Sequence, residues 1–254
     1  LAVMAIIAIL ISMLVPAVNA VRETARSTAC RNNISQLVLA MINYESVHKV
    51  FPINWSNDSS MNGENTRGHS WLTLILPQLE QEPLYKRVKF GERLGYKESG
   101  ASASSGRWNR FVATQPLSIF RCPTDNHRGY MDNQVMLKGE MMGVTNYKAC
   151  AGSNWGSEYV QGTGQKNVKY TKGRNAYQTD GRDRGNGIIS RGARKLLYTT
   201  ASSDIKDGLS NTFAVGEGAP LWDGYSTWYG WDNATSTCGI PLNYNQNSRR
   251  TSDD

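Results

Sequence analysis

The chain has 254 residues, a formal net charge of +7 and a pI of about 9.2. Its hydrophobic content of 39% is enough to build one main globular domain. Lys and Arg are scattered, and no run of them is interleaved with aromatic side chains, so we expect no nucleic-acid partner. The 24 Gly and 12 Tyr are typical of a turn-rich, mostly β body.

The first element in the chain is an apolar helix. Residues 1–21 carry no charged side chain, and at 1.5 Å per residue such a helix spans roughly 31 Å, close to the hydrocarbon thickness of a bilayer. Charges begin at Arg22, where the helix would meet the headgroups. A cleaved signal peptide is the alternative, because residues 18–20 approximate a small-residue cleavage site. A retained anchor is favoured, since no basic segment precedes the apolar run and the helical pattern continues through the supposed cut.

Residues 22–50 continue this helix as an amphipathic half. Apolar residues recur at helical spacing there and predict a face that packs lengthwise on the globular domain. The helix should end near His48, because the residue before Pro52 is driven out of the helical region. The apolar positions are Ile34, Leu37, Val38, Met41 and Ile42.

Within the apolar half, Pro16 should kink the helix, with Ser12 helping to satisfy the freed backbone. Small side chains allow neighbouring helices to approach closely while larger ones fill the gaps, so this half can form a bundle. A monomeric anchor fits the same residues. The candidate membrane and assembly positions are Ala5, Ile6, Ile9, Leu10, Met13, Leu14 and Pro16.

The rest of the chain, residues 51–254, predicts an extracytoplasmic α+β domain. Residues 70–88 have near-helical apolar spacing and predict a second helix, which Pro77 bends or divides into two short turns. We expect a loop over residues 93–110, a long loop region over residues 153–194, and strands at 117–122, 144–149 and 212–215.

Four cysteines, Cys30, Cys122, Cys150 and Cys238, form no close metal-ligand pair, so zinc is not expected. Outside the cytoplasm one or two disulfides are plausible, and three complete pairings remain open beside four separate buried thiols.

Calcium is the one metal ion for which the sequence offers candidate ligands. Asp180, Asp183 and Asn186 lie in a Gly-rich turn, and Asp204 and Asp207 form another pair, but neither group matches an EF-hand. Turn chemistry, in which these side chains bond their own backbone, explains both groups better. No cofactor is expected.

An aromatic cluster near the C-terminal end offers a candidate ligand surface. Its rings could stack on sugars or anchor a partner, although core and sheet packing is the stronger interpretation. The three histidines, His48, His69 and His127, lie in no recognised catalytic motif, and no catalytic residue is assigned. The ligand candidates are Trp222, Trp228 and Trp231, beside Tyr225 and Tyr229.

The order of these features resembles type IV prepilins and type II secretion pseudopilins: an apolar run, a proline in its second half, then a charged amphipathic continuation. More narrowly, residues 21–52 (VRETARSTACRNNISQLVLAMINYESVHKVFP) resemble a large bacterial family of pseudopilin-like proteins. Four further blocks follow in that family's order: SWLTLILPQLEQEPLY (70–85), FRCPTD (120–125), TNYKACAG (145–152) and DIKDGLSNTFAVGE (204–217).

The resemblance also has two departures. The sequence opens at Leu1, after the place where the family has its prepilin recognition site, a Gly before an aromatic or Met and a following Glu. The family's C-terminal H-x9-DG block is also not found before Asp254. We therefore expect this sequence to lack residues at both ends of the family pattern.

The resemblance implies a long pilin-like helix, membrane-spanning in its first half, packed on a mostly antiparallel β domain with long loops. It further implies a bacterial cytoplasmic-membrane protein that is processed by a prepilin peptidase and assembles, with the pilus or secretion machinery, into a homopolymeric envelope filament or pseudopilus. A membrane-tethered module that binds polysaccharide or protein is the alternative function. An envelope hydrolase would need a pair of catalytic carboxylates or histidines that no motif indicates.

Overall fold

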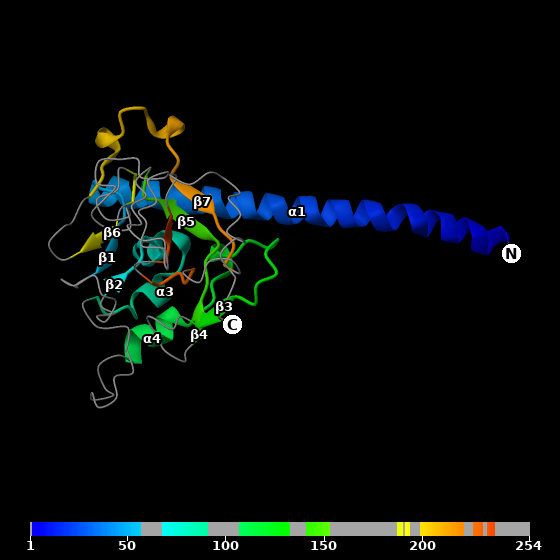
Figure 1. Cartoon of the computed structure of the whole chain (residues 1–254), viewed down its shortest axis with the longest axis horizontal. Coiled ribbons are helices and arrows are strands. Elements are labelled where there is room, and N and C mark those ends of the chain that lie inside the picture. Colours follow the sequence, from blue (N-terminus) through cyan, green and yellow to red (C-terminus); the bar gives the residue numbers. More distant parts are fainter. Residues whose placement is uncertain are drawn as a thin grey trace, which may run out of the picture.

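The computed structural model describes residues 2–56, 68–90, 107–132, 141–152, 187–189, 191–193, 199–220, 226–230 and 233–236. Helix α1 (Ala2–His48) runs along one side of a globular body and extends far beyond it toward the N-terminus (Figure 1). Short helices and small sheets make up the body, so the expected α+β class with a long N-terminal helix is confirmed.

The C-terminal end of α1 falls at His48, as the sequence predicted. Lys49 adopts a left-handed backbone conformation (φ 64°), and its N–H donates to the carbonyl of Glu45 at 2.7 Å. A left-handed residue here closes the last helical turn. The chain then leaves in an extended path, and the N–H of Phe51 donates to the carbonyl of Thr200 at 2.8 Å.

The predicted apolar face of α1 packs on the body, with one exception. Leu37 and Met41 are fully buried, and Ile34 and Val38 are half-buried beside them. Ile42 is 41% exposed and lies toward the outer face of the helix. The buried face is therefore narrower than the sequence pattern suggested, because the body covers only one side of α1.

Residues 70–88 form three short pieces instead of one helix: α2 (Trp71–Leu74), η1 (Leu76–Leu79) and α3 (Glu82–Tyr85). Pro77 falls within η1, and Glu80 adopts a left-handed conformation (φ 60°) that ends it. Breaking the helix lets Trp71 and Leu76 both point into the core while η1 packs against α1.

Two other local expectations are wrong. Residues 107–110, expected in a loop, begin helix α4 (Arg107–Ala113). Residues 118–120, expected in a strand, form a 3₁₀ turn, η2 (Ser118–Phe120), which buries Phe120 completely. A single apolar side chain at the right place is enough to anchor such a turn, and this pattern cannot be told from a short strand by sequence spacing.

Within the described residues, the strands form three small sheets. In the first, β1 (Asn54–Ser56) lies between antiparallel β2 (Gly68–His69) and parallel β6 (Arg191–Ala193). In the second, β3 (Tyr130–Asp132) pairs antiparallel with β4 (Met141–Gly143). In the third, β5 (Tyr147–Cys150) lies between antiparallel β7 (Val215–Glu217) and parallel β8 (Thr235–Ser236). The strand expectations at 144–149 and 212–215 are thus shifted toward later residues, and β6 lies inside the stretch expected as a long loop.

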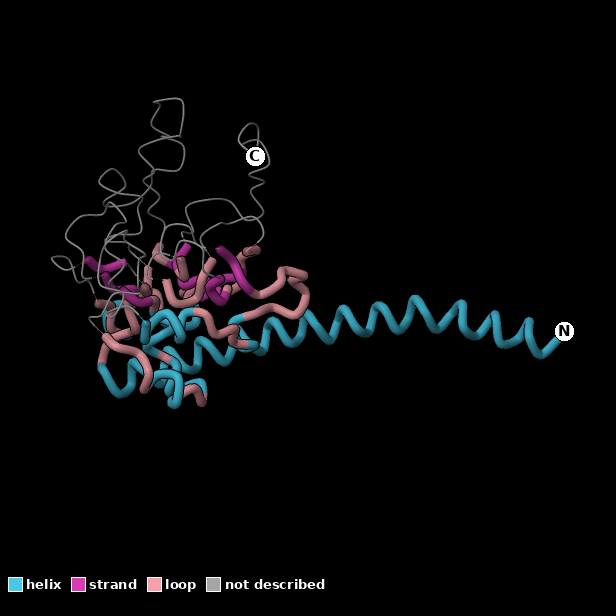
Figure 2. Tube along the Cα trace, turned by 90° about the horizontal axis from the view of Figure 1, so that it is seen from below, coloured by secondary structure: helices cyan, strands magenta, loops and turns pink. Residues whose placement is uncertain are grey.

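The core lies between α1 and the strands. Figure 2 shows the short helices beside α1 and the strands gathered in a layer on one side of them. Trp71 is fully buried, and its indole N–H donates to the carbonyl of Ala234 at 2.8 Å, which ties the helical layer to the third sheet region. Other fully buried large side chains are Leu37, Leu72, Ile75, Leu76, Phe120, Met142, Tyr147, Ile189 and Trp228.

Candidate functional site: the apolar half of the long helix and its junction with the body

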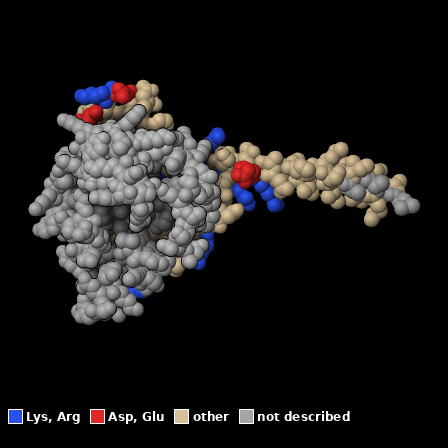
Figure 3. All heavy atoms as spheres, viewed as in Figure 1, with Lys and Arg blue, Asp and Glu red and all other residues tan. Residues whose placement is uncertain are grey.

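The N-terminal half of α1 is uncovered by the rest of the chain. It is long and apolar enough to cross a membrane, and none of its apolar stretch is buried against the body. Such a helix is consistent with a membrane anchor or a signal sequence. On the face shown in Figure 3, charged side chains are absent from the projecting half and appear where it approaches the body.

The candidate assembly positions lie on this surface. The large side chains among them are each more than half exposed, and Val3, Ile7 and Ile11, which point in other directions, are exposed as well, so any environment that covers this half must surround the helix. Exposed fractions are 57% for Ile6, 55% for Ile9, 55% for Leu10, 69% for Met13 and 58% for Leu14. Pro16 is also exposed, whereas the side chain of Ala5 lies outside the described part.

Helix α1 continues through Pro16 without interruption. The hydroxyl of Ser12 donates to the carbonyl of Ile9 at 2.7 Å. It therefore does not satisfy the Ser12 carbonyl that Pro16 leaves without a backbone partner, which differs from the expectation. The first turns of the helix curve gently away from the axis of the remainder (Figure 1). Pro16 therefore bends the helix without interrupting it, although its ring removes one backbone hydrogen bond.

A disulfide joins α1 to the body. Cys30 on the helix is bonded to Cys122, 92 residues later in the chain, with the Cα atoms 4.8 Å apart. The hydroxyl of Thr124 lies 3.6 Å from the Cys30 sulfur and 2.8 Å from the Cys122 sulfur. Of the pairings left open by the sequence, the structure selects this one. Cys150 lies on β5, and Cys238 lies outside the described residues.

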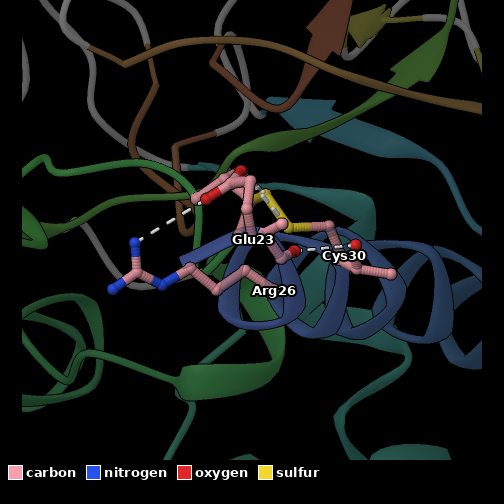
Figure 4. A network of polar contacts seen from close by, with 7 residues as sticks. Glu23, Arg26 and Cys30 are labelled. Carbon is pink, nitrogen blue, oxygen red and sulfur yellow. Dashed lines mark hydrogen bonds and ion pairs between the residues drawn. A yellow bond between two sulfur atoms is a disulfide. The ribbon is translucent and has the colours of Figure 1, made fainter. Parts of the chain in front are cut away.

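Polar contacts on both sides of the disulfide fix the same junction. The Asn33 side-chain amide donates to the carbonyl of Arg121 at 2.9 Å and to the hydroxyl of Tyr147 at 3.3 Å. The Tyr147 hydroxyl in turn donates to the carbonyl of Cys30 at 3.4 Å. Figure 4 shows Cys30 and its disulfide close to the ion pair of Glu23 and Arg26 on the same helix. These bonds orient α1 rotationally as well as attaching it.

Asn146 holds the body side of the junction together. Its side-chain oxygen accepts from the N–H of Cys122 at 3.0 Å, and its amide donates to Asp125 Oδ2 at 2.6 Å and to the carbonyl of Gly218 at 3.1 Å. One buried side chain therefore ties together the segment that holds the disulfide, strand β5 and the end of β7. Its loss would leave several buried polar groups unsatisfied.

The charges near the junction are mixed in sign. Glu23 and Arg26 form a surface ion pair at 3.8 Å with both side chains more than half exposed, an arrangement that contributes little to stability. Partial burial and, secondarily, the nearby carboxylate of Asp125 raise the pKa of Glu217. These groups do not form a patch of a single charge.

Cys30, Cys122 and Glu217 bring three atoms of metal-ligand types within 4.8 Å of one another. The two sulfurs are bonded to each other and so offer no thiolate, which leaves one carboxylate. This group therefore does not fit a metal ion. The calcium candidates Asp180, Asp183 and Asn186 lie outside the described residues.

The second calcium candidate shows turn chemistry. Asp204 Oδ2 accepts from the N–H of Ala201 at 2.9 Å, and the side-chain amide of Asn211 donates to the carbonyl of Asp207 at 3.0 Å. Gly208 has φ +80°, so the chain bends directly after Asp207. Of the two interpretations of these aspartates, local capping is the one that the geometry supports.

Two of the aromatic and histidine residues singled out in the sequence, Trp228 and His69, are buried packing residues. Trp228 is fully buried, and its indole N–H donates to the carbonyl of Gln115 at 2.8 Å, so it offers no face to a ligand. Trp222 and Trp231 lie outside the described residues. His69 packs between Trp55 and Phe90, and burial lowers its pKa to about 4.

Sequence reasoning missed Asn33, Asn146 and Tyr147 as junction residues. Each lies inside a block that carried the family resemblance, RNN around residue 33 and TNYKACAG from residue 145. The blocks were visible, but their contact with each other was not, because more than a hundred residues separate them.

The comparisons with known proteins give one finding. The model of a family described as SBP_bac_10, protein of unknown function (DUF1559), matches residues 19–250. No curated protein and no solved structure matches the chain.

Proposed function

The chain belongs to the DUF1559 family, and we propose that it is a pilin-like or pseudopilin-like subunit whose N-terminal half anchors it in the bacterial cytoplasmic membrane and mediates self-assembly. The assembled form would be an envelope filament or a secretion pseudopilus, built with a prepilin peptidase and an assembly machinery. Its role would be structural, with no catalysis of its own.

The observation that carries this proposal is the division of α1 into two halves with different environments. The first half is apolar on all sides and uncovered, whereas the second half is buried along one face and bonded covalently to the body through Cys30. A helix that served only as a removable signal would not need to continue into the core of the domain. Lipid before assembly, and neighbouring helices after it, both suit the uncovered half.

The disulfide supports an extracytoplasmic body. Disulfides persist in oxidising compartments and are rare in the cytoplasm. Cys30 follows the apolar half by only nine residues, about 13 Å of helix, so the side of the membrane on which Cys30 lies is the side of the body.

Two measurements test the proposal. First, the intact mass of the protein recovered from membranes should include residues 1–21; a mature chain that begins after Ala20 would show that this segment is a cleaved signal and refute the anchor. Second, p-benzoylphenylalanine placed at Leu10 in the full chain should yield covalent dimers on irradiation in membranes. A product that stays monomeric at Leu10 would refute self-assembly and leave a membrane-tethered binding module as the function.

A further inference from the structure

The disulfide that joins α1 to the body lies beside a carboxylate. A side-chain oxygen of Glu217, the last residue of β7, lies within 4.8 Å of both the Cys30 and the Cys122 sulfur. Cys30 is 4% and Cys122 1% exposed, whereas Glu217 is an exposed residue. A reagent that approaches the bond from this side therefore meets the carboxylate before it reaches sulfur.

The fold fixes the position of this carboxylate. Strand β7 pairs antiparallel with β5, and the register places Glu217 opposite Tyr147. Directly after β7, the N–H of Gly218 donates to the carbonyl of Asn146 at 2.6 Å. The hydroxyl of Tyr147 donates to the carbonyl of Cys30 at 3.4 Å. The backbone that carries Glu217 is thus bound to the same residues that hold the disulfide in place.

In the described part of the chain, no cation forms an ion pair with Glu217. Arg26 on α1 is paired with Glu23, and the guanidinium of Arg121 donates to a backbone carbonyl. Partial burial and, secondarily, the like charge of Asp125 raise the pKa of Glu217. A second carboxylate thus adds to the negative charge on this side of the disulfide.

Reductive opening of the bond would place negative charge on its sulfurs. A thiolate of a dithiol reductant attacks the Cys30 sulfur, the more exposed of the two, and the electron pair of the broken S–S bond leaves on the Cys122 sulfur. The Thr124 hydroxyl lies 2.8 Å from that sulfur and must be the donor, because a disulfide sulfur carries no hydrogen. The second thiol of the reductant then releases Cys30 as a thiolate and closes a cyclic disulfide in the reductant. Both released thiolates take protons from water.

We infer that Glu217 protects the disulfide between Cys30 and Cys122 from thiol reductants by charge repulsion. The incoming thiolate carries negative charge to the sulfurs and leaves it there, so the carboxylate opposes both attack and departure. Even with the dielectric constant of water, two unit charges 4.8 Å apart repel enough to slow a reaction about fourfold. Glu217 thereby preserves the covalent attachment of α1 to the body, and this role goes beyond the proposed function.

Reduction rates of the full chain in detergent test this inference. The protein is treated with dithiothreitol at about pH 8, where a carboxylate is ionised, and the released thiols are counted by alkylation and intact mass. We expect Glu217→Gln, which removes the charge and keeps the shape of the side chain, to raise the rate constant about fourfold or more at low salt. The matched control is Glu82→Gln on α3, where the carboxylate pairs with Lys86, and its rate should equal that of the unsubstituted protein.

Two further measurements distinguish charge repulsion from a loosened fold. In about 1 M NaCl the Debye length is only about 3 Å, so the rates of the unsubstituted protein and Glu217→Gln should converge. A series of monothiols that differ in charge provides the second measurement. The effect of Glu217→Gln should be largest with anionic mercaptoethanesulfonate, smaller with neutral mercaptoethanol and smallest with cationic cysteamine. A variant that merely opened more often would react faster with all three by the same factor.

Several outcomes would overturn the inference. Equal rates for the unsubstituted protein and Glu217→Gln, an equal gain from Glu82→Gln, or the same gain with all three monothiols would each refute protection by charge. A bond that resists dithiothreitol in both proteins would show that burial alone protects it, and would also refute the role of Glu217. None of these outcomes bears on self-assembly, which the crosslinks at Leu10 test separately.

Discussion

Two leucines that lie two residues apart on α1 provide a matched test of whether the second half of the helix packs on the body. Leu37 is fully buried among core residues, whereas Leu39 is 58% exposed on the opposite face. Leu37→Ala removes buried methyl groups and leaves a cavity, which costs about 2.7–5.0 kcal/mol in comparable cores. Leu39→Ala makes the same chemical change at the surface and should alter the free energy of unfolding by no more than about 0.5 kcal/mol.

The assay is urea unfolding of the full chain, kept monomeric in detergent and followed by fluorescence of the buried Trp71 and Trp228. Helix propensity cancels between the two variants, since both replace Leu by Ala in the same helix, so their difference reports packing alone. Equal effects for both substitutions, or a loss below about 1 kcal/mol for Leu37→Ala, would refute the docking of the second half of α1 on the body.

Three further predictions concern the disulfide, a buried histidine and the apolar half. Replacing Cys30 and Cys122 together by Ser should lower the free energy of unfolding by about 4.6 kcal/mol in the chain-entropy relation for a loop of this length, measured by the same unfolding assay; a change below about 1 kcal/mol would contradict the bond. His69 is neutral in the folded protein because burial lowers its pKa to about 4, so stability is full above pH 6.5 and falls as the pH drops toward 4, by about 3 kcal/mol at pH 4. His69→Phe should remove this part of the pH dependence, and an unchanged slope would exclude His69 as its source. Leu10→Asp places a charge in the apolar half at a cost of about 3 kcal/mol or more for insertion, so carbonate extraction should release more of this variant than of Leu10→Ala.

Some features of the fold were accessible from the sequence because they depend on neighbours in the chain. The helical period predicted α1, and the restriction before Pro52 predicted its end at His48. The turn chemistry at Asp204 and Asp207 followed the same logic, since its hydrogen bonds join residues no more than four positions apart. Where two local patterns are alike, the prediction was wrong: residues 118–120 formed a 3₁₀ turn in place of a strand.

The sequence by itself determined a long helix with an apolar first half and an amphipathic second half, because both properties follow from side-chain polarity repeated at helical spacing. Only the tertiary structure decided that Cys30 is bonded to Cys122, that Asn146 ties the disulfide segment to β7, and that Ile42 belongs to the outer face together with Leu39. These outcomes depend on which surfaces meet across large separations in the chain. The apolar helix is thus a property of the sequence, whereas its attachment to the body is a property of the fold.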